Sequence, residues 1–324
     1  MTMTTTVLDT VLGPHGQVSA LRSGAVRVDG AELAFTDVKR MPDAYRDMAR
    51  TQPYAVCEMA PTAYLMALSA GAPLTALALP MTRRFRHEGV QRLRSSTITG
   101  PRDLEGQTIG VRNYAVTAAV WTRGLFADDD GVDLSKVSWL TEEEENLPQF
   151  PLPANASRLA SGRKLSQLLA TGELQVAFAG LAGAGNDAGL DLVDLVPDAQ
   201  ARGADWYRRT GVYPLHGVIV LRNDVIAADP GLPARLYTAF EQAKAHYLAR
   251  LHAGTDLDAE DRRYLALEKT IGGDPLPYGL AENAASFEAL VRYVHQQGLV
   301  PSRPHIASVF IDPRVGAGRT ATWE

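Results

Sequence analysis

The feature that most constrains this sequence is an alternation of short apolar runs with helix-like segments, which occurs twice along its 324 residues. Such alternation predicts parallel sheets with right-handed crossover connections. In the first half, strands are expected at 5–12, 31–38 and 73–80, and helices at 17–26, 42–50 and 61–72. After a polar stretch, strands are expected at 108–111, 137–140 and 175–180, and helices at 117–129 and 163–174.

A chain of this length exceeds the size at which one hydrophobic core keeps growing, so two lobes are expected. We predict an α/β fold with a discontinuous first lobe, 1–89 and 208–324, and a second lobe, 90–207. The apolar run 213–224 is read as a strand that returns to the first lobe. Ligands of open α/β sheets bind beyond the carboxyl ends of the strands, which predicts a ligand cleft between the lobes.

Composition narrows the classes of partner. The net charge is −5, which argues against a nucleic-acid or anionic membrane surface, because both require basic patches. The single cysteine, Cys57, excludes an internal disulfide and a multi-cysteine metal site, and its apolar surroundings predict a buried thiol.

The N-terminus lacks the features of a secretory signal, and no apolar run reaches roughly 18 residues, the length that a membrane-spanning helix needs. A cytoplasmic location is expected, and homo-oligomerisation is left open.

The stretch MTRRFRHEGV (81–90) concentrates positive charge directly after a predicted strand. In an extended segment Arg84 and Arg86 share one face, while Arg83 and His87 lie on the other. Guanidinium groups bind carboxylates in a bidentate fork, so two of them suit an aromatic diacid. The alternative is ion pairing between the lobes, and one of the three arginines is expected to be structural. His87 is read as a general acid or base, or else as a satisfied buried histidine.

Residues at the start of the predicted helix 117–129 are a second candidate anion site. Asn113, Tyr114 and Thr117 lie where a helix offers free backbone N–H groups and a positive dipole end. Trp121 is assigned to the core.

Three further residues are candidates in the first lobe. Glu58 precedes the helix 61–72, where it could act as a base or neutralise an arginine, or simply favour the helix N-terminus. His15 and His216 are expected to face the ligand, with a backbone-bonded buried histidine as the alternative for each.

Motifs for other chemistries are absent. The run EEEE (142–145) has no histidine at ligand spacing and is read as a solvated charge run. HExxH, CxxC, GxxxxGK, a G-x-G-x-x-G after a strand and a G-x-S-x-G elbow do not occur. No metal and no organic cofactor are therefore expected.

Four stretches resemble the 4,5-dihydroxyphthalate decarboxylase family in order and in spacing: RRFRH (83–87), 103–126, 210–221 and 274–300. Within these stretches, RRFRH, TAAVWTRG and DPLPYG are the motifs more specific to the family. The resemblance implies the type II periplasmic-binding-protein fold, used as a cytoplasmic enzyme. The implied activity is non-oxidative decarboxylation of a hydroxylated, phthalate-like aromatic acid.

For such a reaction, Arg84 and Arg86 would anchor the retained carboxylate. His87 or His216 would protonate the ring carbon, and Glu58 or His15 would act as the base on the phenol. His15, Asn113, Tyr114 and Thr117 complete the proposed substrate contacts. The alternatives are a non-catalytic binding protein for a small aromatic or carboxylate solute, serving a transporter or sensor, or a different carboxylate lyase on the same fold.

Overall fold

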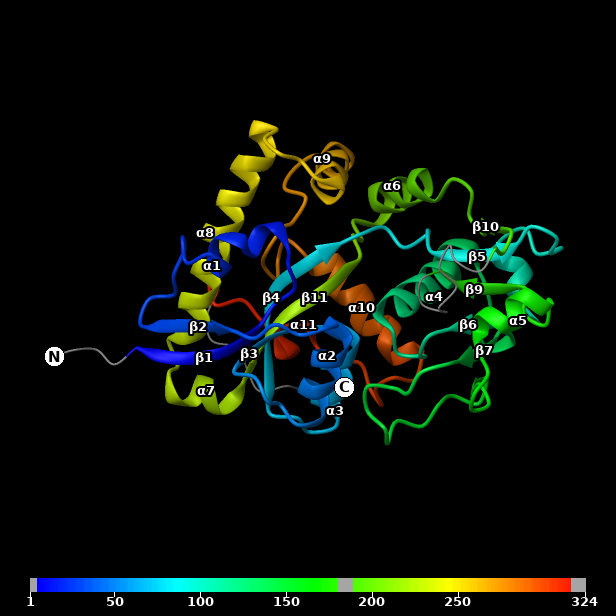
Figure 1. The fold of residues 1–324 in the computed structure, drawn as a ribbon, viewed down its shortest axis with the longest axis horizontal. Coiled ribbons are helices and arrows are strands. Elements are labelled where there is room, and N and C mark those ends of the chain that lie inside the picture. The colour runs from blue at the N-terminus through cyan, green and yellow to red at the C-terminus, as the bar shows by residue number, and fades with distance from the viewer. Residues whose placement is uncertain (1–4, 180–188, 316–324) are drawn as a thin grey trace. The chain divides into compact units, whose positions relative to one another are not determined.

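The structure is a computed structural model that describes residues 5–179 and 189–315 (Figure 1). The chain forms two units. The first comprises Met1–Arg83, Leu215–Val291 and Ser302–Glu324, and the second Arg84–Pro214 and Arg292–Pro301. The lobes predicted from the sequence, with changeovers at 89/90 and 207/208, stay a prediction. The units observed here change over at 83/84 and 214/215, and the second takes in a short segment near the C-terminus.

The first unit contains a six-stranded sheet in the order β12-β4-β11-β3-β1-β2. Its strands are β1 (Thr6–Val11), β2 (Ala31–Phe35), β3 (Val56–Met59), β4 (Leu74–Arg83), β11 (Leu215–Arg222) and β12 (Phe310–Ile311). β11 runs antiparallel to its neighbours β3 and β4, whereas the other pairs are parallel. The carboxyl ends of β1, β3 and β4 and the start of β11 therefore meet at one edge of the sheet, which we call the strand-end edge.

The helices of this unit are η1 (Gly16–Val18), α1 (Ser19–Arg22), α2 (Met41–Arg50), α3 (Pro61–Ser69), α7 (Asn223–Ala228), α8 (Leu232–Ala253), α9 (Ala259–Ile271) and α11 (Ile306–Val309). α8 packs against η1 and α1, and its buried side chains, including Leu236 and Phe240, join Leu79 and Ile219 of the sheet in one core. The chain turns at Asp229, just before α8. The turn there is closed by a hydrogen bond from Leu232 N–H to the Asp229 carbonyl, and the helix begins at Leu232.

The second unit also contains a six-stranded sheet, in the order β10-β5-β9-β6-β7-β8 (Figure 1). The strands are β5 (Val90–Leu93), β6 (Thr108–Val111), β7 (Ser138–Thr141), β8 (Ala156–Arg158), β9 (Val176–Phe178) and β10 (Leu192–Asp194). The helices are η2 (Pro101–Leu104), α4 (Thr117–Asp130), η3 (Leu134–Lys136), α5 (Leu165–Thr171) and α6 (Ala199–Thr210). α10 (Ala284–Gln296) has its last turns, from Arg292, in this unit. Residue 180 of the predicted strand 175–180 lies outside the described residues.

Several short elements were not predicted, and one strand is longer than expected. β3, β5, β8, β10 and β12 have two to four residues each, too few to show a pattern. β4 continues through the first arginine of RRFRH because Arg83 pairs with Leu215 of β11. None of the helices that the structure describes is long and apolar enough to cross a membrane.

Candidate active site

The strand-end edge of the first unit holds a partly buried histidine–glutamate pair. Glu58 lies in β3 with 2% of its surface exposed, and His15 follows the end of β1, with 20% of its side chain exposed. His15 Nε2 is 2.8 Å from Glu58 Oε2, and the Gly13 N–H donates to the same oxygen at 2.9 Å. The pair forms because the turn after β1, Gly13 to His15, lies next to β3 in the sheet.

The protonation states of the two groups support each other. Burial alone would raise the pKa of Glu58, but the charge and hydrogen bond of His15, together with hydrogen bonds from Gly13 and Tyr45, outweigh burial and hold the pKa below its ordinary value. Burial alone would lower the pKa of His15, but the Glu58 carboxylate outweighs it and holds the pKa above its ordinary value. The geometry therefore favours an imidazolium beside a carboxylate, which is a source of a proton near neutral pH.

Two glycines make room for this pair. A Cβ atom at Gly13 would lie 2.5 Å from His15 Nε2 and 2.9 Å from Glu58 Oε2. A Cβ atom at Gly217 would lie 2.5 Å from Glu58 Oε1, and Gly217 has a φ of +88°, which other residues rarely adopt. Any side chain at either position would displace one member of the pair.

His216 lies at the same edge, immediately before Gly217 in β11. It is partly exposed, it pairs in register with Thr82, and its carbonyl accepts a hydrogen bond from the Thr82 hydroxyl. The structure thus brings three predicted residues, His15, Glu58 and His216, to one edge of the sheet.

Arg83 is buried within β4 and has a structural environment. Its guanidinium donates to Asn283 Oδ1 and, at 3.3 Å, to Ser286 Oγ. Its carbonyl accepts a hydrogen bond of 2.6 Å from Arg263 of α9. These contacts fasten the end of β4 to two other parts of the first unit.

Burial alternates along the residues that follow, as expected for an extended segment: Phe85 and His87 are buried, Arg84 is exposed and Arg86 is partly exposed. The Phe85 ring packs on Tyr207 and Tyr213, and the His87 ring meets Trp206 edge-on. Arg84 Nε lies 3.6 Å from a carboxylate oxygen of Glu88, and the Arg86 carbonyl accepts from Thr122 Oγ1 at 2.9 Å. The two arginines with some exposure are the two that were predicted to share a face.

His87 has an environment that disfavours its charged form. Its side chain is fully buried, and its Nε2 lies 3.4 Å from Asp129 Oδ2. Burial, reinforced by Arg202 and Arg209 and opposed by Asp129, lowers the pKa of His87 to about 4. A neutral, buried imidazole has no proton to donate near pH 7, so this environment does not favour the predicted role as acid.

The segment before α4 binds a carboxylate that belongs to the protein. The Tyr114 and Ala115 N–H groups donate to Glu145 Oε1 and Oε2 at 2.6 and 3.0 Å. Asn113, Tyr114 and Thr117 are all buried, and so is Glu145. The interpretation of 142–145 as a solvated charge run is therefore wrong for Glu145, because an internal pair of N–H donors compensates its desolvation.

Sequence reasoning did not find Arg123, which lies within the TAAVWTRG phrase. It is completely buried, and it donates to the Tyr114 carbonyl at 2.6 Å and to Gln297 Oε1 at 2.7 Å. Its guanidinium carbon lies 3.9 Å from the centroid of the Tyr114 ring. Trp121 is buried against Tyr293, as its assignment to the core predicted. This phrase therefore encodes much of the packing of α4.

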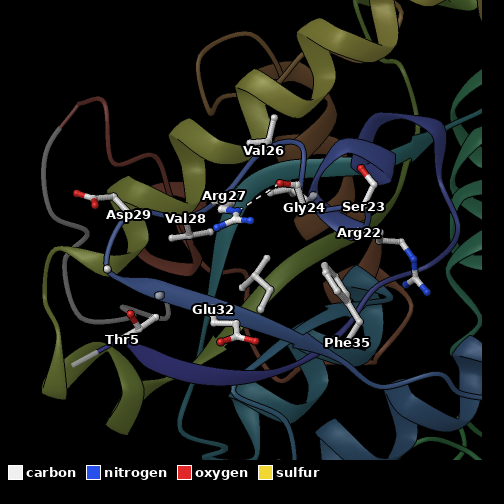
Figure 2. Close-up of a pocket in the computed structure, with 14 residues that line it drawn as sticks. Thr5, Arg22, Ser23, Gly24, Val26, Arg27, Val28, Asp29, Glu32 and Phe35 are labelled. Carbon is white, nitrogen blue, oxygen red and sulfur yellow. Dashed lines mark hydrogen bonds between the residues drawn. The ribbon is translucent and has the colours of Figure 1, made fainter. Parts of the chain in front are cut away.

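A cavity of about 850 Å³ lies elsewhere in the first unit. Figure 2 shows its lining residues, which come from α1, the loop after it and β2, together with Thr5 before β1. None of the predicted site residues lines it. Across the described parts of the chain, no group of three or more His, Cys, Asp or Glu residues could hold a metal ion.

Comparison with known proteins gives the class and then the family. No family model matches the sequence. Two solved structures share the fold: the aliphatic sulphonate binding protein SsuA from Escherichia coli (TM-score 0.54, 10% identity, 94% of this chain and 97% of that one) and the alkanesulfonate-binding protein SsuA from Xanthomonas axonopodis pv. citri (TM-score 0.54, 14% identity, the same coverage). The chain thus has the periplasmic-binding-protein fold, as the sequence predicted.

Two curated relatives are named 4,5-dihydroxyphthalate decarboxylase. The protein from Comamonas testosteroni is 30% identical over 320 residues, which cover 94% of this chain and 96% of the relative. The one from Pseudomonas putida is 29% identical over 210 residues, covering 62% of this chain and 81% of the relative. The chain belongs to the 4,5-dihydroxyphthalate decarboxylase family, as its motifs predicted, and is a carboxy-lyase.

Proposed function

We propose that this protein catalyses the non-oxidative decarboxylation of a hydroxylated phthalate, with 4,5-dihydroxyphthalate as the first substrate to test, and that His15 is the proton donor. The observation that carries the proposal is the His15–Glu58 pair at the strand-end edge. It combines a partly exposed imidazole, a buried carboxylate 2.8 Å away and pKa values displaced in the directions that keep the proton on the imidazole.

The proposed step is redox-neutral and balanced. The aromatic carbon that carries the leaving carboxylate accepts the proton of the His15 imidazolium, which forms the new C–H bond. The C–C bond to the carboxylate then breaks, its electron pair returns to the ring, and carbon dioxide leaves. A hydroxyl para to this carbon promotes protonation by donating electron density, so a phthalate without hydroxyl groups should be inert.

Glu58 is assigned to holding and charging His15 rather than to removing the phenolic proton. Its pKa is held below the ordinary range, and Oε2 already accepts from both His15 and Gly13. A carboxylate in this state is a weak base. Glu58 can nevertheless stabilise the imidazolium throughout the reaction.

Arg84 and Arg86 stay proposed ligands of the substrate carboxylates, on the chemical ground that exposed guanidinium groups bind carboxylates bidentately. Arg84→Lys should weaken binding of a dicarboxylate more than that of a monocarboxylate, because lysine keeps the charge and loses the planar fork. His216 stays a second candidate for the acid, since it lies at the same edge.

The direct test is to incubate the purified protein with 4,5-dihydroxyphthalate in D2O. We expect one equivalent of carbon dioxide per equivalent of 3,4-dihydroxybenzoate, with one deuterium at the vacated ring carbon by mass spectrometry. Unsubstituted phthalate is the control and should release nothing. Saturable binding of the dihydroxy acid without carbon dioxide release would contradict the proposal and favour a binding protein.

A further inference from the structure

Tyr45 approaches the active-site pair from a third element, α2. It is buried, together with Ala44, Met48 and Ala49 on the same face of that helix, and Pro42 lies in the first turn. Its hydroxyl donates to Glu58 Oε1 at 3.4 Å, a long hydrogen bond. Because the ring is fixed by the packing of the helix, the hydroxyl is presented to Glu58 from a rigid support.

The two oxygens of Glu58 are thus engaged by different parts of the first unit. Oε2 accepts from His15 and from the Gly13 N–H, at 2.8 and 2.9 Å. Oε1 accepts from the Tyr45 hydroxyl at 3.4 Å, and it also lies close to Gly217, where an added Cβ atom would be only 2.5 Å from it. A carboxylate that turned about its last side-chain bond would leave the Tyr45 hydroxyl and move Oε2 away from His15.

We infer that Tyr45 is a positioning residue, which holds the Glu58 carboxylate in the rotation that keeps Oε2 on His15. The inference rests on the proposed role of His15 as the proton donor. Tyr45 acts through Glu58: its hydroxyl donates to Oε1, and Oε2 of the same carboxylate contacts the His15 ring.

The Tyr45 hydroxyl could position the Glu58 carboxylate or only withdraw charge from it, and these two roles predict opposite changes in the pKa of His15 when the hydroxyl is removed. If Tyr45 positions Glu58, its loss lets the carboxylate turn, the pairing with His15 weakens, and the pKa of His15 falls. If Tyr45 only draws negative charge from the carboxylate, its loss leaves more charge on Oε2, and the pKa of His15 rises. Glu260 of α9, itself paired with Arg263, also raises the pKa of His15, and both remain in place in the variants.

The test is an NMR titration of the His15 ring in the ligand-free protein, with its resonances assigned by their loss in His15→Asn. In Tyr45→Phe, which keeps the ring and hence the packing of α2, we expect the pKa of His15 to fall by roughly half a pH unit or more. The alkaline limb of kcat should shift by the same amount, and kcat should fall roughly 3- to 30-fold while KM stays within about twofold. Tyr54→Phe, the same chemical change at a partly exposed tyrosine, is the control and should leave the His15 titration unchanged.

An unchanged or raised pKa of His15 in Tyr45→Phe would overturn the inference. Its failure is distinguishable from failure of the proposed function, because the titration needs no substrate. A wild-type protein that releases no carbon dioxide, yet shows the expected fall in Tyr45→Phe, would refute the proposed function while the positioning by Tyr45 stood.

Discussion

His15 Nε2 lies 2.8 Å from Glu58 Oε2, in a space that stays open because Gly13 and Gly217 carry no side chain. The pKa of His15 is raised, so its acid form persists above pH 6.5 and is lost as the pH rises through the folded-state pKa. We predict that kcat is highest on the acidic side of this pKa and falls above it. A pH–rate profile checks this, and a kcat that instead rises through neutral pH would require a base in place of an acid.

Replacing Glu58 removes the charge that holds the proton on His15. In Glu58→Gln, burial becomes the dominant influence on His15, and its pKa should fall below the ordinary value. We expect kcat at neutral pH to fall by roughly 10²-fold, with the alkaline limb moved to lower pH. Glu260→Gln is the matched control, because the charge of Glu260 raises the same pKa less than Glu58 does and its removal should have a much smaller effect. Equal changes of kcat in the two variants would contradict the proposal that Glu58 holds the proton on His15.

His87 should make the protein less stable as the pH falls. The unfolded histidine binds a proton near pH 6.5, whereas the folded one does so only near pH 4. The contribution of neutral His87 to the free energy of unfolding, up to about 3 kcal/mol, is therefore fully present above pH 6.5 and is lost as the pH falls toward 4. Denaturant titrations of the wild type and His87→Gln should show a stability gap that shrinks between pH 7 and pH 4. A gap that stays constant would show that His87 is not held neutral.

Much of the fold could be predicted from the sequence, because the strand–helix alternation is governed by local pattern and burial. β3 was missed because four buried residues show no alternation, and its position is set by β1 and β11 on either side. The sequence singled out His15 and Glu58 separately. It did not predict their contact, since the two residues are 43 positions apart in the chain and are brought together only by strand order.

Glu145, Tyr45 and Arg123 show what local pattern misses. Glu145 belongs to a run of four acids, and only the two N–H groups before α4 distinguish it from its neighbours. Tyr45 and Arg123 sit in ordinary helical sequence, and their partners are 13 and 174 residues away in the chain. Polar contacts of this kind depend on tertiary packing, which no single stretch of sequence encodes.

Glu145 should be essential for the stability of the second unit. Its carboxylate accepts two buried N–H groups and, through its charge, favours the buried guanidinium of Arg123. In Glu145→Gln one of those donors faces the amide NH2 group and loses its acceptor, and Arg123 loses a compensating charge, so we expect a loss of about 2–4 kcal/mol. Glu144→Gln, at the exposed neighbour, should stay within about 0.5 kcal/mol of the wild type in the same denaturant titration. Equal stability of both variants would show that the Glu145 contacts contribute little.

The central claim is that His15 delivers the proton that replaces the departing carboxylate, and His15→Asn tests it most directly. Asparagine keeps a polar side chain of similar reach but cannot carry the proton. Carbon dioxide release from 4,5-dihydroxyphthalate should fall roughly 10²- to 10⁴-fold, while calorimetric affinity for the same acid stays within a few-fold of the wild type. A variant that binds the acid and keeps most of the wild-type kcat would contradict the account and move the proton donor to another residue.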